Sequence, residues 1–511
     1  MALTGARCLA ILGTGSDAGK SVVVTALCRI FSDMGLRVAP FKAQNMSNNS
    51  YVTPDRGEIG RAQVVQAEAA RAPLHVDMNP VLLKPSSDTG AQIVLHGRPL
   101  ANREAGEYFK DTAFLFEKAL GSLNRLRASY DFVVLEGAGS CAEVNLLSMD
   151  IVNMRMAAAA DAPVILVADI DRGGVFAQII GTLDVLPPAD SARIRGFIIN
   201  RFRGDAALFE EGIRYIEERT QRPVLGLIPY FHHIEIDCED GMSIDTLIDP
   251  PGGPDARRIN IAVLRLPHIS NFTDFSPLQR EPSVALHYLM RLRPLVDYDV
   301  VFLPGTKNVR ADLEWMRREH WDSAILDYSK MGGRVVGICG GYQMSGRLIL
   351  DPNGIEGNPG DTQGLGLLDI RTTIMPEKKL ETCSGVWIAD DTPVEGYEIH
   401  MGITDRLTNI PHIIRLQTRS SVASSGLDGS RSSDGRIWGT YLHGLFDGPE
   451  FRSVFLKSID RRGVFQPSGS IALHESLYKQ QQYDLLAQHF KSHLDIAALM
   501  KIARIGITPA V

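Results

Sequence analysis

A cysteine that follows a predicted strand and precedes two glycines is the first candidate for chemistry. Cys339 follows the apolar run Arg334–Ile338 and stands before Gly340 and Gly341. A tight turn of this kind exposes a nucleophile, and the N-terminus of a following helix lowers the pKa of a thiol. We therefore predict that Cys339 is a catalytic nucleophile, with a buried packing cysteine as the alternative.

A thiol nucleophile requires a base, and His443 is the candidate. It follows the apolar run Arg436–Leu442, far along the chain from Cys339. Catalytic pairs are commonly distant in sequence and adjacent in the fold. Backbone N–H groups at Gly305, which ends another predicted strand, and at Gly340 would form an oxyanion hole beside the pair. For Gly305 the alternative is a plain strand-end turn.

A glycine-rich loop with a lysine follows the first apolar run and leads into the helical run Val22–Phe31. Glycines let backbone N–H groups turn toward phosphate oxygens, Lys20 would neutralise the β and γ charges of ATP, and the Ser21 hydroxyl would reach Mg²⁺. The alternative is a glycine-rich turn with an incidental lysine. The predicted ATP-binding residues of this loop are Gly13, Thr14, Gly15, Ser16, Asp17, Ala18, Gly19, Lys20 and Ser21.

Polar side chains end several other predicted strands, at the edge where open α/β sheets bind ligands. Glu136 is a candidate Mg²⁺ ligand together with Ser21, against a solvated strand-end glutamate as the alternative. Asn200 would read the adenine, although asparagines are also common in turns. The predicted substrate-binding or phosphoryl-binding residues are Lys42, Gln44, Asn45, Asp169 and Asp171, and for Lys42 the alternative is an ordinary surface lysine.

Short β-branched runs that alternate with helical stretches must position these residues. Six such runs precede residue 249, and this rhythm predicts a mostly parallel sheet with helices on both faces. Prolines, glycines and charges interrupt it at 249–258, after which the rhythm restarts. The prediction is a first domain at 1–248, a linker at 249–258, a second α/β domain at 259–495 and a tail at 496–511. Residues 420–435 are predicted to form a mobile surface loop without chemistry of its own.

Composition sets limits on function. The chain has 511 residues, which is more than one core usually supports, and its hydrophobic fraction of 44% is that of a globular protein. A net charge of -7 without a basic block argues against nucleic acid as a partner. Six cysteines without a CxxC pair suggest neither a zinc site nor disulfides, and the first apolar stretch is too short for a signal peptide or membrane span. We expect a cytoplasmic protein with no membrane partner.

Together these residues resemble class I glutamine amidotransferases joined to a dethiobiotin-synthetase-like ATPase, as in the cobyrinic and cobyric acid synthases of vitamin B12 assembly. Thr14 stands where a P-loop normally has its first glycine, and the dethiobiotin synthetase type of loop has the same shape. The resemblance implies an α/β fold in which a P-loop parallel-sheet domain precedes a flavodoxin-like amidotransferase domain. It runs nearly end to end and is carried by five blocks: Phe41–Ser47, Leu135–Ser140, Ala168–Gly174, Ile269–Phe275 and Gly396–Gly402.

The resemblance implies an activity with two half-reactions. The first domain would activate a carboxylate as an acyl phosphate with ATP and Mg²⁺, and Cys339 would release ammonia from glutamine through a thioester. The implied substrate is adenosylcobyrinic acid a,c-diamide, amidated at its b, d, e and g carboxylates to adenosylcobyric acid. The alternatives are amidation of cobyrinic acid at a and c, amidation of a lipid-linked cell-wall precursor, and a switch-type partitioning ATPase.

The sequence departs from the triad pattern at one position. Triad amidotransferases usually carry a glutamate two residues after the histidine, which orients the imidazole. That position is Leu445 here. The sequence therefore predicts a dyad of Cys339 and His443, unless Glu398, Asp447 or His400 reaches in from another segment.

Overall fold

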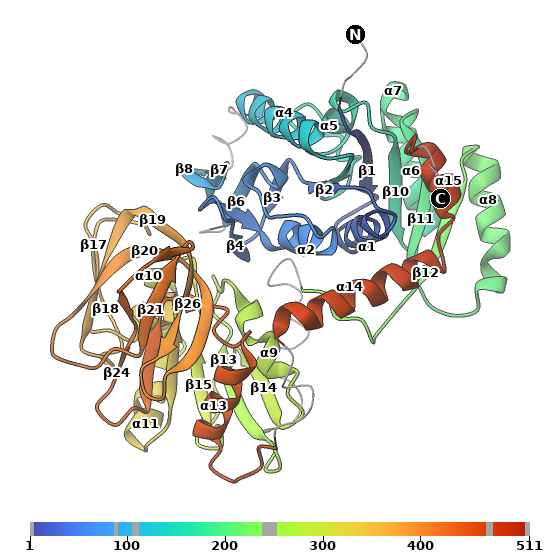
Figure 1. The fold of residues 1–511 in the computed structure, drawn as a ribbon. Coiled ribbons are helices and arrows are strands. Elements are labelled where there is room, and N and C mark those ends of the chain that lie inside the picture. Colours follow the sequence, from blue (N-terminus) through green and yellow to red (C-terminus); the bar gives the residue numbers. More distant parts are fainter. Residues whose placement is uncertain (1–4, 86–89, 105–111, 238–252, 467–473, 506–511) are drawn as a thin grey trace.

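The computed structural model describes residues 5–85, 90–104, 112–237, 253–466 and 474–505. Figure 1 shows two α/β lobes, one built from the blue-to-green first half of the chain and one from the yellow-to-orange second half. Residues 249–252 of the predicted linker, and Cys238, lie outside the described residues. The five described cysteines are all unpaired. No helix of the described segments is both long and apolar enough to cross a bilayer.

The first lobe contains a six-stranded parallel sheet in the order β12-β11-β10-β1-β9-β2. Successive residues of β1 point to opposite faces, so that Leu9 and Ile11 enter one apolar cluster while Ala10 and Leu12 enter another. Each predicted run forms one of these strands, which confirms the parallel sheet. The strands are β1 (Arg7–Gly13), β2 (Val38–Phe41), β9 (Phe132–Glu136), β10 (Val164–Asp169), β11 (Ile194–Phe202) and β12 (Val224–Pro229).

Helices cover both faces of this sheet, and smaller strands extend the lobe toward the second one. The helices of the lobe include α1 (Lys20–Asp33), α2 (Arg61–Ala69), α4 (Thr112–Ser129), α5 (Met154–Ala159), α6 (Val175–Val185) and α8 (Glu210–Thr220). The smaller strands include β3 (Gln44–Met46), β4 (Ser50–Val52), β5 (Glu58–Gly60), β6 (Val81–Pro85), β7 (Gly90–Leu95) and β8 (Arg98–Glu104).

The second lobe has its own sheet in the order β14-β13-β15-β16-β25-β24, parallel except for β24. The α/β class predicted for this half is therefore confirmed. The strands are β13 (Ile259–Leu264), β14 (Val284–Leu289), β15 (Val300–Leu303), β16 (Val335–Ile338), β24 (Ser430–Arg431) and β25 (Ile437–Thr440). The helices include α10 (Val309–Arg318), α11 (Trp321–Lys330), α12 (Gly340–Met344) and α13 (Pro449–Ile459).

A second, mostly antiparallel sheet was not predicted. Its centre is the long pair β19 (Ile370–Trp387) and β20 (Thr392–Arg406), and β20 also pairs with β26 (Leu442–His443). The predicted surface loop at 420–435 also contains buried residues. Asp428 accepts a hydrogen bond from Thr440, and Ser430 accepts one from Tyr342. The segment is therefore partly built into the lobe, and the prediction of a loose surface loop was wrong.

The C-terminal helices belong to the first lobe. In Figure 1 the red helices α14 (Glu475–Lys491) and α15 (Ile496–Ile502) lie beside β12, away from the orange strands that precede them. Tyr483, Phe490 and Leu499 join the apolar cluster that also contains residues of α1. The prediction that residues up to 495 belong to the second domain, followed by a tail, is corrected by this packing.

Polar and aromatic contacts join the two lobes through β4 and β5. The Ser50 backbone N–H donates to Asn271 Oδ1 at 2.9 Å. Lys378 of β19 pairs with the fully buried Glu58 of β5, with 2.5 Å between Nζ and Oε2. The Tyr51 and Tyr397 rings lie 4.3 Å apart between centroids. The interface thus places β4 and β5 of the first lobe directly on β19 and β20.

Candidate active sites

Cys339 occupies a strained turn at the end of β16. Its backbone has a φ of 51°, a left-handed conformation that a residue with a side chain adopts at a cost. It directly precedes α12, and its side chain is 6% exposed. A side chain at Gly341 would collide with the Leu303 backbone, so only glycine permits this close approach of the turn to β15. The turn has the form of a nucleophile elbow, as the flanking glycines indicated.

Strand pairing brings His443 to the cysteine. Ile338 of β16 is in register with Thr440 of β25, so the chain segments that follow both strands end at the same sheet edge. His443 is 1% exposed, and its ring stacks on that of Tyr397 at 5.3 Å. Cys339 raises the pKa of His443, which reflects their proximity. The predicted pair is therefore assembled in the fold.

Asp274 is the orienting carboxylate that sequence reasoning missed. His443 Nδ1 lies 2.7 Å from Asp274 Oδ2, and the Gly444 N–H donates to Asp274 Oδ1 at 2.9 Å. A carboxylate on Nδ1 fixes the proton there and leaves Nε2 available to serve as a base. Asp274 lies in the short 3-10 helix Phe272–Phe275 that follows β13. Its place in the motif block Ile269–Phe275 marked it as a candidate, but nothing local paired it with His443.

The other candidates for this role make different contacts. Leu445 is 2% exposed in the apolar core, so nothing at that position reaches the imidazole. Glu398 pairs with Lys379 and Arg419, with distances of 2.6 and 3.1 Å to its Oε2. His400 stacks on Tyr441 at 3.7 Å. Within the described part of the chain, no hydrogen bond joins Asp447 to the His443 ring. The predicted dyad is corrected to Cys339, His443 and Asp274.

The buried charges around His443 favour its protonated form. Burial by itself would lower the pKa of the imidazole, but the Asp274 carboxylate and then Cys339 outweigh it and raise the pKa to about 10. An imidazolium held beside a cysteine favours the thiolate, which is the nucleophilic form. The arrangement therefore suits attack by Cys339 on an amide carbon.

The two predicted oxyanion-hole glycines lie beside this group. A Cβ added at Gly305 would stand 3.0 Å from His443 Cε1, and one added at Gly340 would stand 2.9 Å from the Thr306 backbone nitrogen. The segment 305–306 therefore packs against both the histidine and the residue after the nucleophile. Backbone N–H groups gathered at one point are what an oxyanion hole requires.

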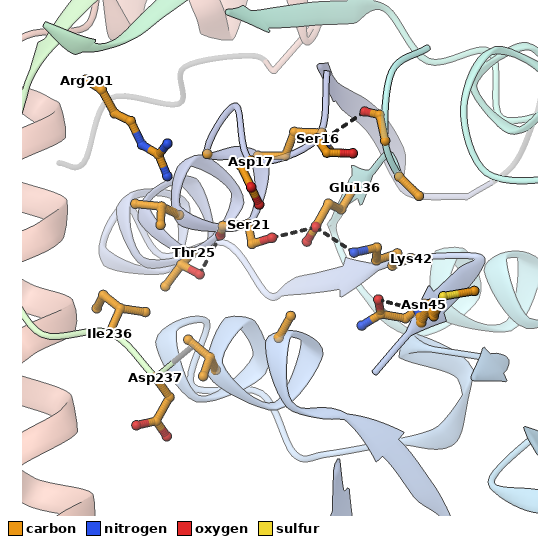
Figure 2. A pocket seen from close by; sticks show the side chains of 18 residues that line it. Ser16, Asp17, Ser21, Thr25, Lys42, Asn45, Glu136, Arg201, Ile236 and Asp237 are labelled. Carbon is orange, nitrogen blue, oxygen red and sulfur yellow. Dashed lines mark hydrogen bonds and ion pairs between the residues drawn. The ribbon is translucent and has the colours of Figure 1, made fainter. Parts of the chain in front are cut away.

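The glycine-rich loop borders a cavity of about 480 Å³ in the first lobe. Figure 2 shows Ser21 and Lys42 converging on Glu136 within it. The Lys20 ammonium donates to the carbonyls of Gly15 and Gly139 at 2.9 and 2.8 Å. The predicted residues that line the cavity are Ser16, Asp17, Gly19, Lys20, Ser21, Lys42, Asn45 and Glu136.

Glu136 is fixed at the centre of a hydrogen-bond network. Its Oε1 accepts from the Ser21 hydroxyl at 2.7 Å and from Lys42 Nζ at 3.0 Å, while Gln66 donates to Oε2. Hydroxyl and carboxylate oxygens are ligands of the type that Mg²⁺ prefers, and protein Mg²⁺ sites commonly supply only one or two such groups beside substrate phosphates. In the described segments, no group of three or more His, Cys, Asp or Glu could hold a metal ion without ligands from a substrate. The donor set therefore fits Mg²⁺.

Several predicted ligands stand outside this cavity. Asn200 is not among the residues that line the cavity, and its side-chain amide donates to the Ala18 carbonyl at 3.0 Å. Its contact with adenine stays a prediction. Asp169 instead pairs with Arg201, which does line the cavity, with 2.9 Å between Nη1 and Oδ2. The remaining predicted residues that do not line it are Gly13, Thr14, Gly15, Ala18, Gln44 and Asp171.

Charged residues from the far side of the cavity were not predicted. Asp237 lines it and pairs with Arg61 and Lys479, with 2.8 Å to each. Burial opposes ionisation of Asp237, but these two cations hold its pKa well below the usual range. Lys479 comes from α14, so the returning C-terminal helix supplies an ion-pair partner to a residue that lines the cavity. No local motif marks these residues.

A smaller cavity, of about 50 Å³, lies between the lobes beside Cys339. The first lobe contributes Lys84, whose ammonium is 2.6 Å from Glu58 Oε1. The second lobe contributes Cys339 and the charged residues Lys307, Glu356 and Lys378. The thiol site therefore opens toward the interface.

Comparison with known proteins agrees with both sites. The CobB/CobQ-like glutamine amidotransferase domain matches residues 260–451, and the CobQ/CobB/MinD/ParA nucleotide binding domain matches residues 9–244. A cobyric acid synthase of Chlorobium phaeobacteroides (strain BS1) is 54% identical over 97% of this chain and 99% of its own. Another, of Chlorobium chlorochromatii (strain CaD3), is 52% identical over 97% of both chains. The structure of PurLQS from Thermotoga maritima is 16% identical, covers 46% of this chain and 99% of that chain, and has a TM-score of 0.29. The two matched domains, and sequence identity above 50% over nearly the whole chain, show that the chain belongs to the cobyric acid synthase family.

Proposed function

We propose that this chain amidates carboxylates of a corrinoid with ammonia from glutamine, at the expense of ATP. The substrate would be adenosylcobyrinic acid a,c-diamide, and four amidations at b, d, e and g would give adenosylcobyric acid. The observation that carries the proposal is the presence, in one chain, of a phosphate-binding cavity and an assembled cysteine, histidine and aspartate group.

The first lobe would activate the carboxylate. Lys20 and the glycine-rich loop bind the phosphates of ATP, and Lys42 holds the transferring phosphoryl group or the anionic substrate. Ser21 and Glu136 would hold Mg²⁺, which would supply positive charge near the phosphates. A carboxylate oxygen attacks the γ-phosphorus, ADP leaves, and an acyl phosphate forms. Because phosphate is a far better leaving group than hydroxide, ammonia can then displace it.

The second lobe would supply the ammonia. The Cys339 thiolate attacks the side-chain amide of glutamine, and Gly305 and Gly340 stabilise the oxyanion. His443, oriented by Asp274, gives a proton to the departing nitrogen, so that NH₃ leaves and a glutamyl thioester remains. Water then hydrolyses the thioester to glutamate and restores the thiol. Release at the interface places NH₃ between the lobes, shielded from protonation to ammonium in bulk water.

Mass spectrometry of the corrinoid tests the proposal directly. The protein is incubated with the corrin diamide, ATP, Mg²⁺ and glutamine, and four successive amidations are expected. Omission of ATP or glutamine should abolish every step. Amidation of cobyrinic acid at a and c, or of a lipid-linked precursor instead, would assign a different substrate. ATP hydrolysis without any amidation would favour the switch-type ATPase and contradict the proposal.

A further inference from the structure

A cavity of about 190 Å³ lies at the opposite edge of the first lobe's sheet from the glycine-rich loop. Arg7, the first residue of β1, lines it, whereas Gly13 at the end of β1 leads into the loop. At about 3.3 Å per residue, this strand puts about 20 Å between the two edges. The remaining walls come from the end of α4, from the turn between α5 and β10, and from the end of α15. The cavity is therefore separate from both sites described above.

Positive charge is in excess in the wall of this cavity. The arginines that line it are Arg7, Arg127 and Arg504. Among the described residues of the wall, Asp161 is the one acidic residue. Its carboxylate already lies 3.1 Å from Arg504 and 3.9 Å from Arg193. Within the described part of the chain, Arg7 and Arg127 form no ion pair, so the wall lacks negative charge that an anionic ligand would supply.

Arg127 is buried and yet leaves most of its donors unused. The residue is 8% exposed, and its Nε donates to the Ala6 carbonyl at 3.0 Å, which fixes the guanidinium in place. In the segments that the structure describes, no hydrogen bond from either Nη atom is present. The neighbouring Cys8 thiol supplies no negative charge, because burial raises its pKa to about 12. A buried cation without a counter-charge is costly, and an anion in the cavity would offset that cost.

We propose that this cavity binds a small anion of the phosphate class, with Arg127 as the central contact and Arg7 and Arg504 beside it. A guanidinium presents its N–H donors in a planar fork that fits the oxygens of a phosphate. The three arginines come from β1, from α4 and from the end of α15, so they approach a ligand from different sides. A tetrahedral phosphate offers oxygens to several sides at once, whereas a planar carboxylate does not.

An anion at this place would fasten the returning C-terminal helices to the first lobe. Arg504 directly follows α15, and its pair with Asp161 is the ion pair that joins this end of the chain to the turn before β10. A phosphate shared by Arg504 and Arg127 would add a second link, from α15 to α4. Because such a ligand binds the folded protein, it should also raise the temperature of thermal unfolding. Neither effect depends on the amidation reaction.

Calorimetric titration tests the proposal in the unmodified protein. The cavity at the glycine-rich loop is first filled with Mg²⁺ and a non-hydrolysable ATP analogue, so that added phosphate cannot bind there. Inorganic phosphate, pyrophosphate, AMP and malonate are then titrated at constant ionic strength. We expect saturable binding of a phosphate compound that is tighter than binding of malonate. The order among the three phosphate compounds distinguishes a free phosphate from a phosphate monoester. The absence of saturable phosphate binding, or tighter binding of malonate, would overturn the proposal.

Substitutions then assign the binding to this cavity. Arg127→Met should weaken phosphate binding about 10- to 100-fold, because hydrogen bonds to a charged group are lost. Arg7→Met changes an exposed side chain and should weaken it about 2- to 5-fold. Arg219→Met, on the exposed face of α8, should leave it unchanged. Equal affinity of all variants for the ATP analogue verifies the fold. Unchanged phosphate affinity in Arg127→Met would contradict the proposal, and Arg7→Met decides if that variant does not fold.

Discussion

The two candidate sites differ in how their walls are made. The phosphate-binding cavity measures about 480 Å³ and is lined by the first lobe, whereas the cavity at Cys339 measures about 50 Å³ and takes one wall, Lys84, from the other lobe. A large cavity suits ATP and a bulky acid. A small cavity at an interface suits a step whose small product passes between the lobes. The difference indicates that the first site is complete within its lobe, while the second depends on contact between the lobes.

Substitution at the two sites should separate the half-reactions completely. Cys339→Ala should abolish amidation supported by glutamine and leave amidation supported by high ammonium largely intact, because only the ammonia source is lost. Lys20→Ala or Glu136→Ala should abolish amidation with either nitrogen donor, because no acyl phosphate forms. The measurement is corrinoid amidation with each donor. Failure of ammonium to rescue Cys339→Ala, or its rescue of the other two variants, would break the comparison.

Asp274→Asn tests the assembled histidine. The carboxylate raises the pKa of His443, so its loss should lower that pKa and let the neutral imidazole persist at lower pH. The amide also favours the wrong tautomer, and in serine proteases the equivalent change costs about 10⁴ in rate. We expect a similar loss of glutamine hydrolysis with ammonium-supported amidation retained. An active Asp274→Asn variant would show that the imidazole has another orienting partner.

Glu58→Gln tests the dependence of the second site on the interface. The substitution leaves Lys84 and Lys378 buried without their shared anion, and breaking a buried pair in this way costs about 3–5 kcal/mol. Lys378 and Lys84 hold the pKa of Glu58 well below normal against its burial, so its stabilising charge is lost only in strongly acidic solution. Thermal unfolding and glutamine hydrolysis should both report the loss near neutral pH, with Glu377→Gln as the exposed control. Unchanged stability would show that this ion group does not hold the lobes.

Tyr51→Ala tests communication between the sites and should have the smallest effect. Tyr51 contacts Tyr397, which stacks on His443, and Arg61 lies over the Tyr51 ring while pairing with Asp237 of the larger cavity. We expect ATP and corrinoid to stimulate glutamine hydrolysis. A coupling free energy of about 1–3 kcal/mol between the two sites would correspond to a stimulation of about 5- to 150-fold. Tyr51→Ala should remove most of this stimulation, and Tyr51→Phe should retain it. Full stimulation in the alanine variant would exclude this route.

Much of both sites was readable from local patterns. The cysteine turn, the glycine-rich loop and the strand ends are encoded within a few residues, because glycine conformations and strand periodicity are local properties. The parallel strands then gather their C-terminal ends at one edge. Hence Cys339 and His443, or Lys20, Lys42 and Glu136, could be predicted to converge from sequence alone.

Only the tertiary structure decided the contacts between distant segments, because no local pattern encodes them. Asp274 reaches His443 from beyond β13, Lys479 reaches Asp237 from a helix that returns to the first lobe, and the Asn200 side chain bonds to the Ala18 carbonyl of the glycine-rich loop. The sequence shows that each side chain can carry charge or hydrogen bonds. Which partner it meets depends on strand order, on the antiparallel sheet and on the interface, because these set distances that separation along the chain does not.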